Sequence, residues 1–219
     1  MCYGRTMSGR TVAPTQRRAQ ADRREATRQA LLDAAIECLV EEGYAALTTR
    51  KVAARAGVSQ GAQQHYFPGR VDLVVQAVGH LAERLVAEAH EQVRTRHRDE
   101  RRRVEALLDR SWELHCGPVF RAAAELWAVA HSDADLRGPI EDLGRALDRQ
   151  FAELIAEMLP ALARDEVGRT LFDIAFATTR GLALRRLPGL ELTVDRRWHA
   201  ARALLLSTYD GLTGTDAVA

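Results

Sequence analysis

Apolar residues recur with helical spacing along most of the chain. Between about residues 22 and 42 one face collects Leu32, Ala35, Ile36 and Leu39, while charged side chains fill the other faces, and Gly43 ends the pattern. No run of alternating apolar and β-branched residues is long enough for a strand, so the sequence predicts an all-α fold of about nine helices. Beyond residue 70, the expected helices are at about 70–95, 101–115, 118–131, 135–159, 164–186 and 194–211.

The segment 47–73 has a different pattern, which indicates two short helices joined by a tight turn. Thr48 or Thr49 caps the first helix, and Gly57 ends it by adopting a left-handed conformation. Ser59 caps the second helix, which a Pro-Gly pair ends. A helix, a turn that contains glycine and a second helix too polar for a core favour a helix-turn-helix, whose second helix enters the major groove of DNA.

The same segment reads G-Y-x-x-L-T-T-R-K-V-A-x-x-A-G-V-S-x-G-x-x-x-x-Y-F-P-G-R-x-x-L. Over roughly residues 27–73 it resembles the DNA-binding domain of the tetracycline-repressor-like (TetR) transcriptional regulators. This resemblance implies an all-helical homodimer that binds a palindromic operator, usually as a repressor, and releases it when a small molecule enters the carboxy-terminal domain. The sequence departs from the family pattern at Gln63, where an apolar residue is frequent, and at Gln64, where a DNA-contacting tyrosine is common. Both departures are expected to alter the operator sequence.

The amino end of the second short helix directs free N–H groups and a positive dipole end at phosphates or base edges. Gln60 is the best candidate for reading bases, since its amide can pair with adenine N6 and N7. Two alternatives remain open, that Thr48 only caps its helix and that His65 and Tyr66 partly serve packing. The residues expected to contact DNA are Thr48, Thr49, Arg50, Ser59, Gln60, Gly61, Ala62, Gln64, His65, Tyr66 and Arg70.

The net charge of +1 hides a division along the 219 residues. Residues 1–70 hold eleven Arg and Lys against six Asp and Glu, whereas the remainder holds twenty against twenty-four. A basic amino-terminal module fits a polyanion-binding domain, so we expect a disordered basic arm at 1–22, a helix-turn-helix domain at 23–70 and an effector-binding and dimerisation domain at 71–219. The arm is either a plain tail or a segment whose arginines follow phosphates or a minor groove.

Aromatic residues are scarce, at 5% of the chain, yet they recur on the apolar faces of the later helices. They are either plain core or the lining of an apolar effector pocket with a few polar groups, which His115, His131, Thr179 or Arg180 could supply. The expected pocket residues are Trp112, His115, Phe120, Trp127, Phe151, Met158, Phe172 and Phe176.

The last two helices combine small and bulky apolar residues, a mixture that allows close helix approach in a four-helix bundle built by two chains. Burial within one subunit is the alternative. The residues expected at a dimer interface are Leu171, Ile174, Thr178, Gly181, Leu182, Trp198, Ala201 and Leu205.

The three cysteines are widely spaced, with no C-x-x-C pair, which suggests reduced thiols in a cytoplasmic protein and neither a disulfide framework nor a metal site. No apolar stretch is long enough for a membrane helix. The chain has no H-E-x-x-H motif, phosphate-binding glycine loop or nucleophile elbow, so we expect neither an enzyme nor a cofactor.

Two functions follow from the sequence. The first is a dimeric repressor that binds operator DNA and is released by a small molecule. The second is a helix-turn-helix regulator without a small-molecule inducer, which a protein partner controls or which acts constitutively.

Overall fold

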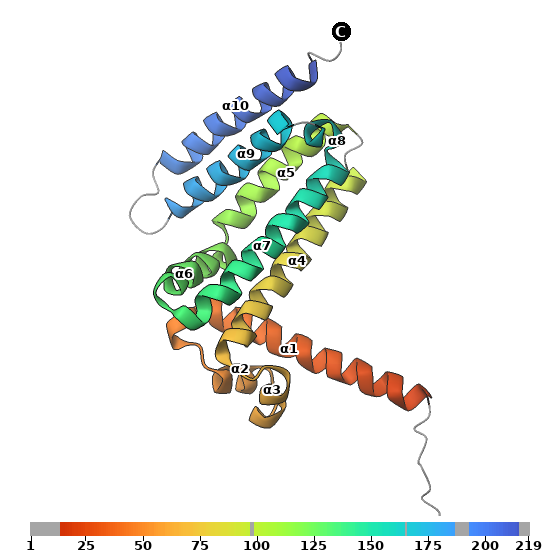
Figure 1. The fold of residues 1–219 in the computed structure, drawn as a ribbon, viewed down its shortest axis with the longest axis vertical. Coiled ribbons are helices and arrows are strands. Elements are labelled where there is room, and N and C mark those ends of the chain that lie inside the picture. The colour runs from red at the N-terminus through yellow and green to blue at the C-terminus, as the bar shows by residue number, and fades with distance from the viewer. Residues whose placement is uncertain (1–13, 97–98, 165, 187–192, 215–219) are drawn as a thin grey trace, which may run out of the picture.

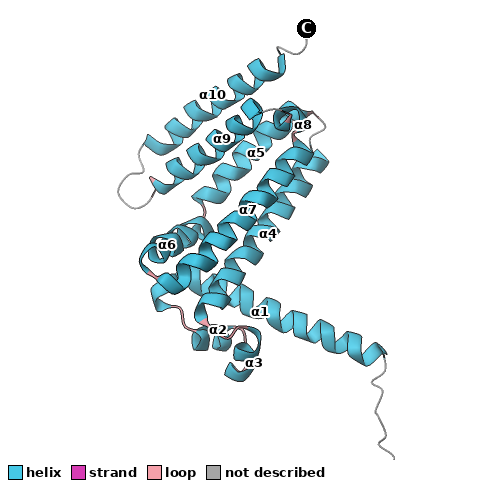
Figure 2. Ribbon diagram, viewed as in Figure 1, coloured by secondary structure: helices cyan, strands magenta, loops and turns pink. Residues whose placement is uncertain are grey.

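A computed structural model of the chain describes residues 14–96, 99–164, 166–186 and 193–214. These residues form helices and no strand (Figure 2), which confirms the all-α prediction. The helices are α1 Pro14–Ala46, α2 Thr49–Arg55, α3 Gln60–Tyr66, α4 Arg70–Arg96, α5 Glu100–Cys116, α6 Pro118–Ser132, α7 Ala134–Met158, α8 Pro160–Ala163, α9 Glu166–Leu184 and α10 Val194–Gly214. The sequence did not predict α8, a single turn that begins at a proline.

The helices form an elongated body (Figure 1). Helices α4, α5 and α7 run along its long axis, with α4 packed against α7 and α5. Helices α2 and α3 lie at one end, and α9 and α10 form an outer layer that packs on α5. The helix-turn-helix and the outer layer are therefore well separated, at different parts of the body.

Helix α1 begins at Pro14, so the prediction that residues 1–22 form a disordered arm is wrong for residues 14–22. A proline at the first helical position, followed after Thr15 by Gln, Arg and Ala residues, favours this helical start. Residues 1–13 lie outside the described residues. At the other end, Gly43 takes φ 76°, which interrupts the helix where the sequence predicted its end. This conformation is strained for any residue with a Cβ atom.

The helix-turn-helix shares its apolar core with the body of the protein. One cluster joins Leu31 of α1, Val52 of α2 and Phe67 with Leu73 of α4 and Leu126 of α6, and each of these side chains is at most 1% exposed. A three-helix module of this size buries little apolar surface by itself. The boundary proposed at residue 70 therefore does not separate two cores.

A second core lies between α5, the end of α7, α8, α9 and α10. Within it the indole rings of Trp112 and Trp198 stack with centroids 4.9 Å apart and planes 7° from parallel. Helix α10 thus contributes one face to the core of its own chain.

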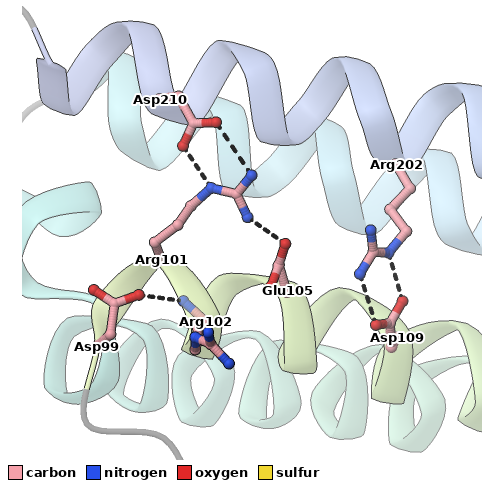
Figure 3. Close-up of polar contacts among 7 residues, drawn as sticks. All are labelled: Asp99, Arg101, Arg102, Glu105, Asp109, Arg202 and Asp210. Atoms are coloured by element: carbon pink, nitrogen blue, oxygen red, sulfur yellow. Dashed lines mark hydrogen bonds and ion pairs between the residues drawn. The ribbon is translucent and has the colours of Figure 1, made fainter.

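Two arginine–carboxylate pairs also fasten α10 to α5 (Figure 3). Arg202 binds Asp109 through two hydrogen bonds of 2.6 and 2.8 Å, and Arg101 binds Asp210 in the same two-pronged manner. Such forked pairs fix orientation better than single contacts, so they hold the outer layer in register with the body. Among the described helices, none is both long and apolar enough to cross a membrane.

Candidate nucleic-acid interface and ligand cavity

Side-chain caps define both helices of the helix-turn-helix. The Thr48 hydroxyl oxygen accepts a hydrogen bond of 3.2 Å from the Lys51 amide, and the Ser59 hydroxyl oxygen accepts one of 3.2 Å from the Ala62 amide. Gly57 closes α2 with φ 68°. The capping roles and the turn predicted from the sequence are therefore present, and they fix the angle at which α3 leaves the turn.

The residues predicted to contact DNA come together on α2, α3 and the start of α4, at one end of the molecule (Figure 1). The exposed ones are Thr48, Arg50, Ser59, Gln60, Gly61, Gln64 and His65. The half-buried ones are Thr49, Ala62, Tyr66 and Arg70. A short polar helix with an exposed amino end and a glycine near it suits insertion into a groove.

Gln63 is the exception within α3. Its side chain is 1% exposed, and its Nε2 donates a hydrogen bond of 2.8 Å to the carbonyl oxygen of Phe67, one turn later. The expectation that Gln63 alters the operator sequence does not fit this position, because a buried side chain presents nothing to a base. Gln63 instead satisfies a carbonyl at the end of the helix. The four-residue spacing from Phe67 was the signal in the sequence, since it places both side chains on one face.

Two of the cations on α2 are engaged within the protein. Lys51 pairs with Glu42, and the guanidinium of Arg55 lies 2.7 Å from Glu41, so both side chains fasten α2 to the end of α1. Arg50 is exposed and forms no ion pair with the described residues. Of the three, Arg50 is therefore the one suited to a phosphate.

Arg70 lies at the start of α4 on an aromatic platform. Its Cζ atom is 3.7 Å from the centroid of the Tyr44 ring, a distance typical of a cation–π contact. Tyr44 is only 4% exposed and belongs to the first core, so the platform is rigid. The stacked guanidinium is held in one orientation beside the helix-turn-helix.

Glu125 ties the Tyr44 platform to α6. The Tyr44 amide donates a hydrogen bond of 3.0 Å to Glu125 Oε1. The neighbouring Gly43 leaves room for this carboxylate, because a Cβ atom there would come within 2.8 Å of Glu125 Oε1. Glu125 therefore adds a polar link to the apolar contact that Leu126 of α6 makes in the first core. The sequence did not reveal this link, because Tyr44 and Glu125 are far apart in the chain.

Six of the predicted pocket residues form one connected group of rings. Neighbouring ring centroids are between 4.7 and 6.2 Å apart, in edge, tilted and stacked arrangements. Such pairs stabilise a core beyond the burial of area alone. We call this group the ring cluster, and its members are His115, Phe120, Trp127, Phe151, Phe172 and Phe176.

A cavity of about 60 Å³ borders the ring cluster. Phe172 and Phe176 contribute to its wall, whereas Trp112 and Met158, also predicted as pocket residues, do not. Trp112 instead stacks on Trp198, and Met158 is buried at 3% exposure in the second core. The lining residues are Val104, Leu107, Leu108, Ser111, Ile155, Leu159, Leu162, Leu171, Phe172, Ala175, Phe176, Thr179, Leu205 and Tyr209.

The polar groups around the cavity are neutral. His115 Nδ1 lies 2.7 Å from the carbonyl oxygen of Ser111, and because a carbonyl only accepts, this nitrogen carries the proton. Burial lowers the pKa of the His115 imidazole, and the nearby Arg180 lowers it further. Burial also raises the pKa of the Tyr209 phenol to about 12. The Thr179 hydroxyl donates a hydrogen bond of 2.8 Å to the carbonyl oxygen of Ala175.

Helices α9 and α10 carry exposed apolar side chains. Among the described residues, the large apolar side chains that remain exposed are Val167, Ile174, Leu184 and Leu204, at 58%, 52%, 42% and 69%. All four belong to these two helices. Exposed apolar side chains concentrated on two neighbouring helices are typical of a contact surface.

The predicted interface residues divide between this face and the interior. Ile174 and Gly181 are exposed, whereas Trp198 and Leu205 are buried at 2% and 8% within their own chain. Trp198 and Leu205 fill the second core of their own chain, so they offer little surface to a second chain. Leu204, the most exposed of these apolar side chains, is not in the predicted set. The half-buried members of the predicted set are Leu171, Thr178, Leu182 and Ala201.

The fold and the capped helix-turn-helix define a helix-turn-helix DNA-binding protein. Residues 31–77 match the model of the family described as bacterial regulatory proteins, tetR family. The chain is 30% identical over 177 residues to the HTH-type transcriptional regulator CymR of Pseudomonas putida, covering 78% of this chain and 85% of that protein. The chain belongs to the tetR family of bacterial regulatory proteins, which confirms the resemblance drawn from the sequence.

Two further comparisons agree with this assignment. The HTH-type transcriptional repressor KstR of Mycolicibacterium smegmatis is 26% identical over 181 residues, which cover 83% of this chain and 87% of that protein. The crystal structure of the transcriptional regulator FadR from Bacillus subtilis in complex with stearoyl-CoA superposes with a TM-score of 0.61 at 17% identity, covering 82% and 97% of the two chains. The chain is thus similar in sequence and fold to transcriptional regulators along most of its length.

Proposed function

We propose that the chain forms a homodimer that represses transcription by binding a palindromic operator and that a small, largely apolar effector releases it. Residues 23–70 would bind DNA, and residues 71–219 would bind the effector and the second chain. The observation that carries this proposal is the pairing of a capped, polar α3 at one end with exposed apolar side chains on α9 and α10.

Operator recognition rests on the exposed residues of α2 and α3. Gln60 at the first position of α3 is exposed, so its amide can reach a base edge. Arg50 and the stacked Arg70 would bind phosphates on either side and thereby fix the position of α3. Each chain would read one half-site, and two half-sites about one helical turn or a multiple apart give a palindrome.

Dimerisation rests on the exposed apolar face. Ile174 of α9 and Leu204 of α10 are each more than half exposed, and burying such a side chain contributes about 1.5–3 kcal/mol. Gly181 and Ala201 on the same helices are small enough to allow close approach of a second helix pair. Two copies of the α9–α10 pair would then form a four-helix bundle with twofold symmetry.

Effector binding requires the cavity beside the ring cluster to expand. Its present volume of about 60 Å³ is well below the ~300 Å³ or more that small-molecule pockets occupy. Phenylalanine and leucine side chains form most of the wall, and their rotation can open the space. The Bacillus subtilis FadR structure, which has the same fold, contains stearoyl-CoA. The small cavity also favours the second candidate, a regulator without a small-molecule inducer.

Selection of bound sites from random duplex DNA tests the proposed DNA-binding role. We expect enrichment of one palindromic sequence, with half-sites centred about 10 base pairs or a multiple apart. A Gln60→Ala variant should lose preference at one position in each half-site while the spacing stays the same. Failure of the wild-type chain to enrich any sequence would overturn the operator role.

A screen of apolar compounds by thermal unfolding separates the two candidates. An effector should raise Tm, because it binds the folded state alone, and the same compound should weaken binding to the selected operator. Compounds that raise Tm without releasing DNA would count against the inducer mechanism. If no compound raises Tm or weakens operator binding, the result would favour the second candidate, a regulator without a small-molecule inducer.

A further inference from the structure

Arg180 of α9 is a half-buried cation among aromatic rings. Its Cζ atom lies 4.6 Å from the ring centroid of Trp127 and 5.3 Å from that of Phe176. Both rings belong to the ring cluster, and His115 of the same cluster is close enough for the guanidinium to lower its pKa. Arg180 does not line the cavity itself, but its guanidinium lies against the ring of Phe176, which does.

No carboxylate of the described residues lies within 4.0 Å of this guanidinium. Two other arginines differ from Arg180 in this respect. Arg101 and Arg202, at the contact between α5 and α10, each bind an aspartate through two hydrogen bonds. Cation–π contacts contribute about 0.5–2 kcal/mol, which is less than the cost of removing a charge from water without a counter-ion. Arg180 is thus a cation whose surroundings lack an anion.

The register of α9 connects this cation to the cavity. Phe172, Phe176 and Arg180 are four residues apart, so they lie in one row along the helix. Phe172 and Phe176 line the cavity, and the row leads from them to the guanidinium. A ligand whose apolar part lies against the two phenylalanines would place its end at Arg180.

We propose that the effector is an apolar carboxylic acid whose carboxylate pairs with Arg180 while its body occupies the expanded cavity beside Phe172 and Phe176. A planar guanidinium binds a carboxylate through two parallel hydrogen bonds. A single cation matches a monoanion, and the other polar groups near the cavity, His115, Thr179 and Tyr209, are neutral. A phosphate dianion would lack a second cation here. This inference rests on the proposed effector-responsive function.

The pairing also offers a route to regulation. Arg180 lies over Trp127 of α6, two residues after Glu125, which binds the Tyr44 amide at the DNA-facing end. A carboxylate that draws the guanidinium off the Trp127 ring would change the contact between α9 and α6. Ligand charge and operator affinity would then be linked through α6.

Matched pairs of apolar carboxylic acids and their primary amides, graded in size from hexanoic to dodecanoic acid and from benzoic to naphthoic acid, test the proposal with the full chain. Thermal unfolding gives apparent affinities, and displacement from the selected operator gives the functional response. We expect acids to bind about 10-fold or more tightly than their amides, since a hydrogen bond to a charged group contributes more than one to a neutral group. The preference should fall below about threefold in Arg180→Gln.

Two further variants sharpen the result. Arg180→Lys keeps the positive charge but loses the two parallel N–H donors of the guanidinium. Part of the preference for acids over amides should therefore remain. Arg149→Gln removes an exposed arginine from α7 and should leave the preference unchanged. Unfolding of Arg180→Gln without ligand shows whether the variant folds, and removal of an unpaired cation should not lower its Tm.

The outcomes distinguish this inference from the function on which it rests. Amides that bind as tightly as acids, or an acid preference that survives Arg180→Gln, would overturn the carboxylate proposal and leave an effector-responsive regulator. The absence of any binder among both series would overturn the proposal as well and would count against effector control itself. Operator binding by the wild-type chain is measured separately and is not affected by either result.

Discussion

The helix-turn-helix and the α9–α10 layer use their apolar residues in different ways. In the first region Leu31, Val52 and Phe67 are completely buried, and the surface that remains is polar. In the second, Trp198 and Leu205 are buried, yet Ile174 and Leu204 remain exposed. The first region buries its large apolar side chains and exposes polar groups, whereas the second leaves large apolar side chains exposed to solvent.

This difference indicates the kind of partner that each region suits. A polar helix with an exposed amino end and flanking arginines matches phosphates and base edges. A layer that has both buried and exposed apolar side chains matches a second protein surface.

Removal of a buried indole should have the largest effect. Trp198→Ala leaves a cavity in the second core and removes the stack on Trp112, so we expect a loss of about 3–5 kcal/mol in unfolding free energy. Urea unfolding followed by circular dichroism measures it, with Trp198→Phe as the conservative control. Unchanged stability with impaired dimerisation would show that Trp198 belongs to the interface after all.

Loss of the base-reading amide should have a smaller and sequence-specific effect. Gln60→Ala is expected to weaken operator binding by about 1–3 kcal/mol with little change on random DNA. Arg70→Ala should weaken both and reduce the salt dependence by about one unit, because it removes a phosphate contact. Fluorescence anisotropy over a range of salt concentrations provides both values. Equal losses on both DNAs for Gln60→Ala would contradict base reading.

The Glu125 link should have a modest effect on DNA binding. Glu125→Ala removes the acceptor for the Tyr44 amide, so the platform beneath Arg70 loosens, and we expect a loss of about 1 kcal/mol in operator affinity. Glu125→Gln keeps an acceptor and should restore most of the affinity. Arg121→Ala, one turn earlier on α6, is the matched control. An equal loss in Arg121→Ala would mean that any change on this face perturbs the helix.

The smallest effect concerns pH. The pKa of His115 in the folded chain lies below the unfolded value, so the folded state favours the neutral imidazole. Its contribution to stability is present above the unfolded pKa near 6.5 and is lost as pH falls through the folded pKa. We therefore expect the wild type to lose more stability than His115→Phe between pH 7.5 and 5. Parallel losses in urea unfolding would contradict a buried neutral histidine.

The sequence predicted local features well where a few neighbouring residues decide the structure. Thr48, Gly57 and Ser59 fix the caps and the turn through bonds within four residues, and each has the predicted role. The start of α4 at Arg70 follows from the preceding Pro-Gly pair in the same way.

Features that depend on distant residues were not accessible from the sequence. The burial of Gln63 depends on how α3 rests on the first core, and the inward position of Trp198 depends on its stacking with Trp112. Helical spacing shows that α10 has apolar residues on two faces, but it does not tell which face meets the body. The contracted cavity is likewise set by side-chain packing between five helices.

The central claim is that two chains joined through α9 and α10 bind one operator. The mass of the complex on the selected palindrome, from sedimentation velocity, tests it directly for the wild type and for Ile174→Asp combined with Leu204→Asp. We expect two 24.3 kDa chains, or a multiple of two, on the palindrome, and loss of dimer and of tight binding in the double variant, with Ala152→Asp on α7 as a control. A single wild-type chain bound with the same affinity to a half-site and a full palindrome would contradict the account.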